Sequence, residues 1–468
     1  MGCRVRSIAC FLVVLVAGTA SAQADRYELG RRLKQFEAAW EAQPDPAARK
    51  RALAIVPAAS MQFLSFQLGD AARTLDSARL ALISNDAVTD ERLILESLAV
   101  TPETRVVASG RKELILTLKS VYPVKAPVAE GLTVRISFAG KIVELKPEKV
   151  PAKLTLPLDH LAAKKSFDGP IEVSIERGKQ ALKWTVDLSL IEHFESRLTA
   201  LKMGKLETPT LESASVAERY ELLSGLINGV PQETDLPAAS LLDEAELIAN
   251  SGLNKPFYTA NRDGQFRLAV PTSAKDRTAC RLFVPKGLDP KKPVPLVVAL
   301  HGAGGSENLF FEGYGGGHIV KECEERGWLL VSPRSVLLGG SPPVPAIVAK
   351  LAERYPIDLK RVFLVGHSMG AGQAVELVQQ SPGAYAGLAV LGGAGRIRKP
   401  EAFATLPTFI GVGTQDFALN GSRSLAKALT QANAKGMTAK EYPDLEHLII
   451  VREALPDAFS MFDRVRSE

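Results

Sequence analysis

The spacing of hydrophobic positions divides the chain into segments of different periodicity. In residues 23–100 hydrophobic residues recur three or four positions apart, as on one face of a helix. The clearest such face holds Leu29, Leu33, Phe36 and Trp40. We interpret it as a packing surface rather than an exposed groove, so residues 23–100 are predicted to form a helical N-terminal region.

Residues 101–192 change to an alternation of hydrophobic and polar positions. The segments 132–138, 171–175 and 182–190 each show this period of two, which is typical of half-buried strands. Several short strands of this kind predict a small antiparallel β-sandwich. The sequence shows no cluster of exposed aromatic residues that would make a sugar platform. A spacer or interaction domain is favoured, and carbohydrate or protein contact through it stays open.

The remaining chain combines a helical stretch with an α/β pattern. Residues 193–260 return to helical periodicity and are predicted to link the modules. Within 261–468 two alternating segments are followed by continuous apolar runs, at 266–270, 280–284, 296–300, 328–331, 362–365, 388–391 and 409–412. Continuous runs are buried on both faces, as in a parallel sheet covered by helices. The sequence therefore predicts an α/β C-terminal domain with a mostly parallel sheet and helices on both faces.

Residues 1–22 have the pattern of a secretory signal peptide. Arg4 and Arg6 precede an apolar run, and the small residues 20–22 follow it. The run is shorter than the roughly 20 residues needed to span a bilayer, so an uncleaved anchor is the less favoured interpretation. The mature protein is predicted to be periplasmic or extracellular, with no integral membrane segment.

Composition and charge exclude several functional classes. The 468 residues, 46% hydrophobic and 23% charged, suit a globular protein of two or three domains. The net charge is only +5 and the basic residues are scattered, so no nucleic-acid partner is predicted. Cys280 and Cys323 do not have zinc-site spacing, and the sequence leaves open whether they form a disulfide or stay free. No dinucleotide or Walker-type motif is present, so neither a cofactor nor a metal is predicted.

A candidate nucleophile directly follows the apolar run at 362–365. The segment Gly366-His-Ser-Met-Gly370 lies between this run and a helical pattern, which is the setting of a nucleophile elbow. The two glycines leave room for a tight turn that lifts Ser368 above the sheet. The positive end of the following helix then points at negative charge forming beside Ser368, which makes Ser368 the predicted nucleophile.

A serine hydroxyl needs a base, and few of the six histidines suit that role. His447 lies near the C terminus, where a loop after a final strand can fold back over the sheet. The interpretation as a surface histidine is less favoured. For the carboxylate that orients it, Asp416 follows the run at 409–412 and is preferred to Asp444, which lies only three residues from His447. The order Ser368, Asp416, His447 is the one expected for this kind of elbow.

The segment His301-Gly-Ala-Gly-Gly305 follows the strand predicted at 296–300. Attack on an ester carbonyl creates a negative oxygen that backbone N–H groups must hold. We predict the amides of Ala303 and Met369 as donors, and the sequence leaves open whether Gly304 replaces Ala303. Three aromatic residues of the loop 307–317 either line an acyl pocket or pack that loop: Phe310, Phe311 and Tyr314.

These motifs together resemble the α/β-hydrolase superfamily. The resemblance is closest to the compact exported esterases of the polyhydroxybutyrate depolymerase and feruloyl esterase group. It spans the residues from Gly264 to the end of the chain and not 23–260. It implies metal-independent ester hydrolysis through an acyl-enzyme, with Ser368, Asp416 and His447 as the triad.

The resulting hypothesis is an exported serine carboxylic ester hydrolase acting on a small-molecule or polymer-linked ester. One alternative is a serine peptidase of the prolyl-oligopeptidase type, which also joins a β-rich domain to this catalytic fold. The short spacings between the triad positions and the absence of a propeller repeat argue against it. The other alternative is a binding protein whose hydrolase domain is catalytically silent, although all triad positions are filled.

Overall fold

The computed structural model describes most of the chain after the N-terminal segment. The described residues are 20–125, 128–161, 165–202, 208–228, 230, 232–273, 276–335 and 340–465. The predicted signal peptide lies outside them, apart from the backbone of its last three residues. None of the described helices is both long enough and apolar enough to cross a bilayer.

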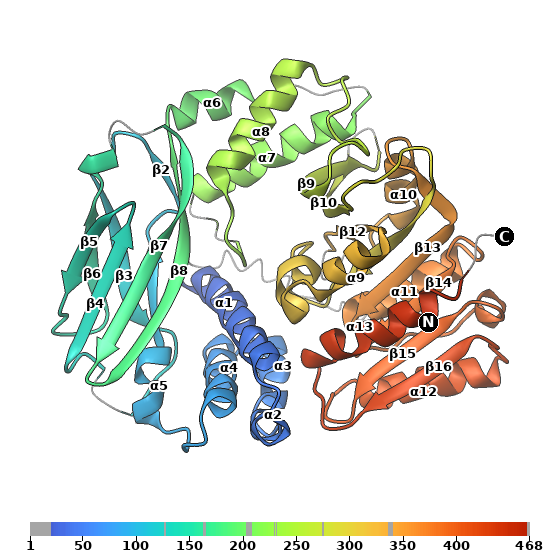
Figure 1. The fold of residues 1–468 in the computed structure, drawn as a ribbon, viewed down its shortest axis with the longest axis horizontal. Helices are drawn as coiled ribbons and strands as arrows, with labels where there is room; N and C mark the ends of the chain where they lie inside the picture. Colours follow the sequence, from blue (N-terminus) through green and yellow to red (C-terminus); the bar gives the residue numbers. More distant parts are fainter. Residues whose placement is uncertain are drawn as a thin grey trace, which may run out of the picture.

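The C-terminal half is built on one eight-stranded sheet, ordered β16-β15-β14-β13-β11-β12-β10-β9 (Figure 1). Its strands are β9 (Gly264–Pro271), β10 (Arg277–Val284), β11 (Val294–Leu300), β12 (Leu329–Pro333), β13 (Ile357–His367), β14 (Gly387–Leu391), β15 (Thr408–Gly413) and β16 (Met437–Tyr442). The strands from β16 to β12 in this order are parallel, whereas β10 pairs antiparallel with both β9 and β12. This confirms the predicted mostly parallel sheet.

Helices cover both faces of this sheet. Their bounds are α9 (His318–Arg326), α10 (Val344–Ala352), α11 (Met369–Gln380), α12 (Leu419–Gln431) and α13 (Ile449–Phe462). Val297 and Ala299 of β11 belong to the core beneath α9 and α13, whereas Leu296 and Val298 belong to the core beneath α10, α11 and α12. Burial on both faces explains the continuous apolar runs. This is the α/β-hydrolase fold, as predicted.

Two sheets that share one core form the β-rich region. One has the order β1-β3-β6 and the other β2-β8-β7-β4-β5. The strands are β1 (Leu98–Pro102), β2 (Val106–Ala108), β3 (Glu113–Ser120), β4 (Leu132–Phe138), β5 (Lys141–Leu145), β6 (Ala152–Pro157), β7 (Phe167–Arg177) and β8 (Gln180–Ile191). Alternate residues such as Leu116 and Ile136 point into the common core. The sheets are antiparallel except where β2 joins β8, so the predicted sandwich is present.

The N-terminal helices lie between the sandwich and the hydrolase sheet (Figure 1). They are α1 (Ala20–Ala42), α2 (Pro46–Leu53), α3 (Pro57–Leu64), α4 (Leu68–Ile83) and α5 (Asp90–Glu96). Phe36 and Trp40 of α1 are buried in a core that also contains Ile449 of α13. Trp40 Nε1 also donates a hydrogen bond of 3.1 Å to Glu453 Oε1. Phe36 and Trp40 of the predicted face therefore pack, in part against the hydrolase domain. Leu29 and Leu33 of the same face also border a cavity, so the interpretation of this face as a packing surface alone was incomplete.

The predicted linker is a packed layer in the structure. It holds α6 (Phe194–Ala200), α7 (Leu211–Ile227) and α8 (Ala238–Ser251). Val216 and Leu223 of α7 share a core with Leu268 of β9, so this segment covers the edge of the hydrolase sheet as well as connecting the two parts. Short helical turns complete the described elements: η1 (Asp159–Leu161), η2 (Leu309–Gly313), η3 (Tyr314–Gly316) and η4 (Pro400–Phe403).

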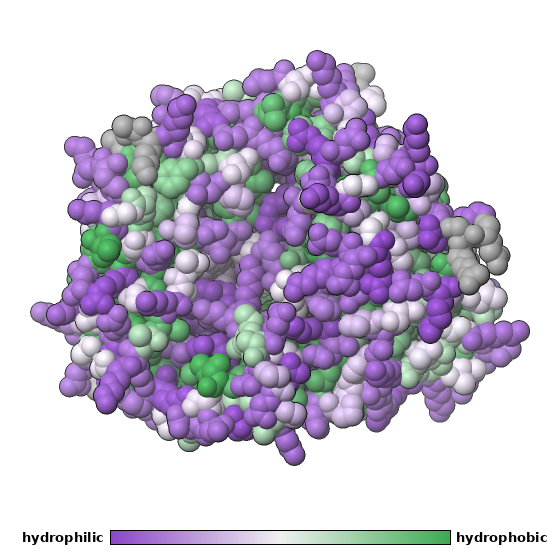
Figure 2. All heavy atoms as spheres, viewed as in Figure 1, coloured by the Kyte–Doolittle hydropathy of each residue, from purple (hydrophilic) through white to green (hydrophobic). Residues whose placement is uncertain are grey.

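Hydrophilic side chains cover most of the face drawn in Figure 2, and its apolar patches are small and scattered.

The two cysteines of the described residues, Cys280 and Cys323, are both buried free thiols. Burial raises the pKa of each thiol well above its usual value, so neither is an activated nucleophile.

Candidate active site

Ser368 lies in a sharp turn between β13 and α11. Its φ of 56° and ψ of −116° are unfavourable for a side-chain-bearing residue, as expected of a nucleophile elbow. A Cβ on Gly366 would lie 2.3 Å from the carbonyl oxygen of Gly370, and one on Gly370 would lie 2.0 Å from that of Leu300. The strand and helix approach so closely that only glycine fits at both positions. Ser368 is thereby held above the sheet, at the N terminus of α11.

The structure places His447 against Asp416. His447 Nδ1 donates a hydrogen bond of 2.8 Å to Asp416 Oδ1, and the two residues are 6% and 4% exposed. Asp416 follows β15 and is fixed by the amide of Ala418, which donates to the same carboxylate oxygen at 2.8 Å. Asp444 is exposed, and its amide bonds Thr414 instead, so the structure favours Asp416 over this alternative.

Ser368, His447 and His367 line one cavity. Because Nδ1 of His447 donates to Asp416, its Nε2 is the nitrogen available to accept a proton. Within the described part of the chain, Ser368 Oγ makes no hydrogen bond to this nitrogen. Catalytic hydrogen bonds of this kind tighten when substrate binds.

His367 and Tyr314 form a hydrogen-bonded connection that sequence reasoning did not assign. His367 Nε2 donates to the His447 carbonyl oxygen at 2.9 Å, and Tyr314 donates to His367 Nδ1 at 2.6 Å. The Tyr314 hydroxyl in turn accepts from the Gly302 amide at 3.2 Å. Burial and the neighbouring His447 hold the pKa of His367 well below its usual value, so His367 is a neutral positioning residue.

The loop after β11 carries the predicted oxyanion donors. Ala303 lines the cavity, and the Met369 amide is the first of α11, where no intrahelical partner exists. His301 is buried beneath the loop; its Nε2 accepts from the Ser335 amide at 2.9 Å, which leaves Nδ1 to donate to the Gly302 carbonyl. Neither predicted donor amide has a hydrogen-bond partner among the described residues, so both remain available to an oxyanion.

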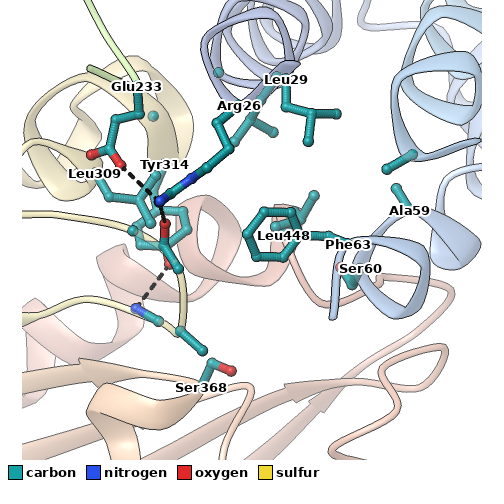
Figure 3. A pocket seen from close by; sticks show the side chains of 18 of the residues that line it. Arg26, Leu29, Ala59, Ser60, Phe63, Glu233, Leu309, Tyr314, Ser368 and Leu448 are labelled. Carbon is teal, nitrogen blue, oxygen red and sulfur yellow. Dashed lines mark hydrogen bonds and ion pairs between the residues drawn. The ribbon is translucent and has the colours of Figure 1, made fainter. Parts of the chain in front are cut away.

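The cavity has a volume of about 160 Å³ and a wall that the sequence did not predict. That wall comes from α1, α3 and α4 (Figure 3). Phe63 of α3 lies against the loop that carries Ala303, since a Cβ on Gly304 would lie 2.5 Å from its ring, and Leu29 of α1 is also part of the lining. Arg26 donates to the Gly304 carbonyl and lies 3.7 Å from Glu233 Oε2. The N-terminal helices therefore form one wall of the candidate site.

The three aromatic residues whose role the sequence left open differ in placement. Phe310 and Phe311 are buried in the core, whereas Tyr314 is buried and also lines the cavity. Leu309, which the sequence reasoning did not single out, is part of the lining as well. Tyr314 thus belongs to the site, while the two phenylalanines pack the loop.

Two buried carboxyl groups lie behind the site. Burial raises the pKa of Glu446 to about 7, although the amides of Leu448 and Ile449 donate to its carboxyl oxygens at 2.9 and 2.7 Å. Burial likewise raises the pKa of Glu37 on α1 to about 8, because it outweighs the charge of Arg452 at 4.0 Å. No group of three or more potential metal ligands occurs among the residues that the structure describes.

No protein-family model matches the chain, and no curated protein matches it. Among solved structures, a feruloyl esterase module from Clostridium thermocellum complexed with sinapinate is similar at 14% identity and a TM-score of 0.39. This match covers 46% of this chain and 94% of that one. S-formylglutathione hydrolase from Staphylococcus aureus is similar at 13% identity and a TM-score of 0.36, over 43% of this chain and 98% of that one.

The structural match to a thermostable esterase extends over more of this chain than the two matches above. It is similar at 15% identity with a TM-score of 0.39, over 79% of this chain and 100% of that one. At such identities and TM-scores, the function of this protein has to be inferred from its own site.

Proposed function

We propose that the protein is a serine carboxylic ester hydrolase that works through an acyl-enzyme. The observation that carries this proposal is the 2.8 Å hydrogen bond from His447 to Asp416 in the cavity that contains Ser368 at the elbow. A serine is a weak nucleophile unless a neighbouring base removes its proton, and an oriented neutral imidazole is such a base.

In the proposed mechanism His447 Nε2 accepts the Ser368 proton while Oγ attacks the ester carbonyl carbon. The carbonyl π electrons move to the oxygen, and the amides of Ala303 and Met369 hold the resulting oxyanion. Collapse of the tetrahedral intermediate breaks the bond to the alkoxide, which takes the proton from His447 and leaves as the alcohol. Asp416 keeps Nδ1 protonated and stabilises the imidazolium that forms in between.

Hydrolysis then repeats these steps with water. His447 accepts a proton from water while the water oxygen attacks the acyl carbon. The second tetrahedral intermediate then collapses by breaking its bond to Ser368 Oγ, which takes the proton back from His447, and the carboxylic acid leaves. We further propose that the protein acts after export, on the basis of the signal-like residues 1–22.

Short and medium p-nitrophenyl esters and a proline-containing peptide amide test the proposal. Purified wild type should hydrolyse the esters, leave the amide intact and lose ester turnover when Ser368 is replaced by alanine. Amide cleavage that depends on Ser368 would point to a peptidase instead. A folded wild type that turns over neither substrate would favour the binding-protein alternative.

A further inference from the structure

Residues far from Ser368 in the sequence form the distant wall of its cavity. The apolar side chains of this wall come from α1, α3 and α4: Leu29, Leu33, Ala59, Phe63, Leu64, Ala71 and Leu75. Leu309 and Leu448 of the hydrolase domain complete the hydrocarbon lining, and Leu448 packs against the core of the N-terminal helices (Figure 3 labels both). The space beyond Ser368 is therefore largely apolar and favours a ligand group that loses little hydration on entering it.

The charged groups at the cavity are paired with one another. Lys34 Nζ donates to Glu312 Oε2 at 2.8 Å, and Arg26 lies 3.7 Å from Glu233 (Figure 3). Each charged side chain of the lining therefore has a partner of opposite charge, and Glu312 also binds Arg267 and Arg281, which lie outside the lining. Because burying a lone charge in an apolar space is costly, the cavity favours a neutral group.

Ser60 on α3 differs from these paired residues. It lines the cavity, is only 6% exposed, and its Oγ has no hydrogen-bond partner within the described residues. A buried hydroxyl without a partner is destabilising, and a ligand that supplies one removes that cost. Ser60 therefore places a hydrogen-bonding atom on an otherwise apolar wall.

We infer that the cavity binds a neutral, mainly apolar half of the ester between α1, α3 and α4. Ser60 Oγ hydrogen-bonds a polar atom of that half, such as a hydroxyl or ether oxygen. This inference rests on the proposed ester hydrolysis at Ser368 and specifies the substrate class. It also assigns the N-terminal helices to the substrate site, where Phe63 and Ser60 determine specificity.

Chain-length profiles test the apolar part of the inference. The substrates are p-nitrophenyl esters from acetate to octanoate and alkyl acetates from ethyl to octyl. Only the series whose variable chain enters the cavity should respond. In that series each added methylene should raise kcat/KM by about fourfold until the cavity is full. Phe63→Ala should flatten that rise, because it removes part of the wall. Met61→Ala is the matched control, since Met61 lies on the same helix, is 49% exposed and is outside the lining. Equal profiles for wild type and Phe63→Ala in both series would overturn the inference.

Terminal hydroxyl groups test the role of Ser60. For each chain length the ester is compared with its ω-hydroxy derivative, and the ratio of the two kcat/KM values is the readout. At the length that reaches Ser60, Ser60→Ala should lower this ratio by about 2- to 10-fold, whereas exposed Ser65 at the end of α3 provides the control Ser65→Ala. An unchanged ratio at every length in Ser60→Ala would refute the proposed hydrogen bond.

Binding without chemistry separates this inference from the proposed function. Calorimetry measures how alkanols and the corresponding terminal diols bind to the Ser368→Ala protein. Binding that weakens in Ser368→Ala with Phe63→Ala, together with no ester turnover by wild type, would reject ester hydrolysis and keep the apolar site. Ester turnover with neither chain-length dependence nor alkanol binding would reject the apolar site and keep ester hydrolysis.

Discussion

Replacing Gly370 by alanine tests the geometry that holds Ser368. The added Cβ would lie 2.0 Å from the Leu300 carbonyl oxygen and 2.8 Å from that of His301, closer than Cβ atoms approach backbone oxygens. Relief of the first contact needs a shift of about 1 Å between α11 and β11, and a displacement of that size at a reacting group costs on the order of 10²-fold in rate. Both contacts are with backbone, so no side-chain rotation removes them.

The assay is p-nitrophenyl ester hydrolysis, with circular dichroism and thermal unfolding to establish that the variant is folded. Gly372→Ala is the matched control, because it lies two residues along the same helix and its Cβ would meet only the Ala394 carbonyl oxygen at 3.2 Å. Folded Gly370→Ala should lose about 10²-fold in kcat, whereas Gly372→Ala should stay near wild type. A folded Gly370→Ala protein with near wild-type kcat would refute the reasoning.

Three further changes have defined outcomes. Asp416→Asn should lower kcat by about 10⁴-fold in steady-state kinetics, because the amide favours the wrong imidazole tautomer, while Asp444→Asn should have little effect. A larger loss in Asp444→Asn than in Asp416→Asn would refute the assignment of Asp416. Tyr314→Phe leaves Nδ1 of His367 without its donor and should lower kcat by about 10-fold with KM almost unchanged, whereas a purely structural role would lower the unfolding temperature without this split. The pKa of Glu37, about 8 in the folded protein against an ordinary value near 4.5, makes unfolded chains bind fewer protons between these pH values. Stability should therefore fall as pH rises through this interval, and Glu37→Gln should remove a slope of roughly 1.4 kcal/mol per pH unit in chemical denaturation. Parallel pH curves for wild type and this variant would show that the carboxyl is not held neutral.

The strands, the tight turn and the position of Asp416 could be predicted, because each depends on residues that are close together in the sequence. Strand β11 and residues 362–365 of β13 are continuous apolar runs, because both are buried on both faces of the sheet. The tight turn at Ser368 follows from the glycines on either side of it. Asp416 could be chosen because a side chain at the carboxyl end of a buried parallel strand reaches the same edge of the sheet as the elbow.

The far wall of the cavity could not be predicted in this way. Periodicity in α1 predicted that Leu29 and Leu33 lie on one inward face, but it contains no information on which distant segment they pack against. Ser60 and Phe63 lie in a helix of eight residues, too short for a clear periodic pattern. Two hydrogen bonds of His367 depend on how three loops meet: the one it accepts from Tyr314 and the one it donates to the His447 carbonyl oxygen. These contacts are set by tertiary packing and become visible only in the folded chain.

The most direct test of the central claim is covalent labelling of Ser368 by a fluorophosphonate, which reacts with activated serines without requiring knowledge of the natural ester. Mass spectrometry of the digested protein locates the adduct. The proposed mechanism predicts one phosphonylated peptide containing Ser368, abolished by Ser368→Ala and formed much more slowly by His447→Ala. A folded wild-type protein that remains unlabelled at Ser368, or one labelled at the same rate without His447, would contradict it.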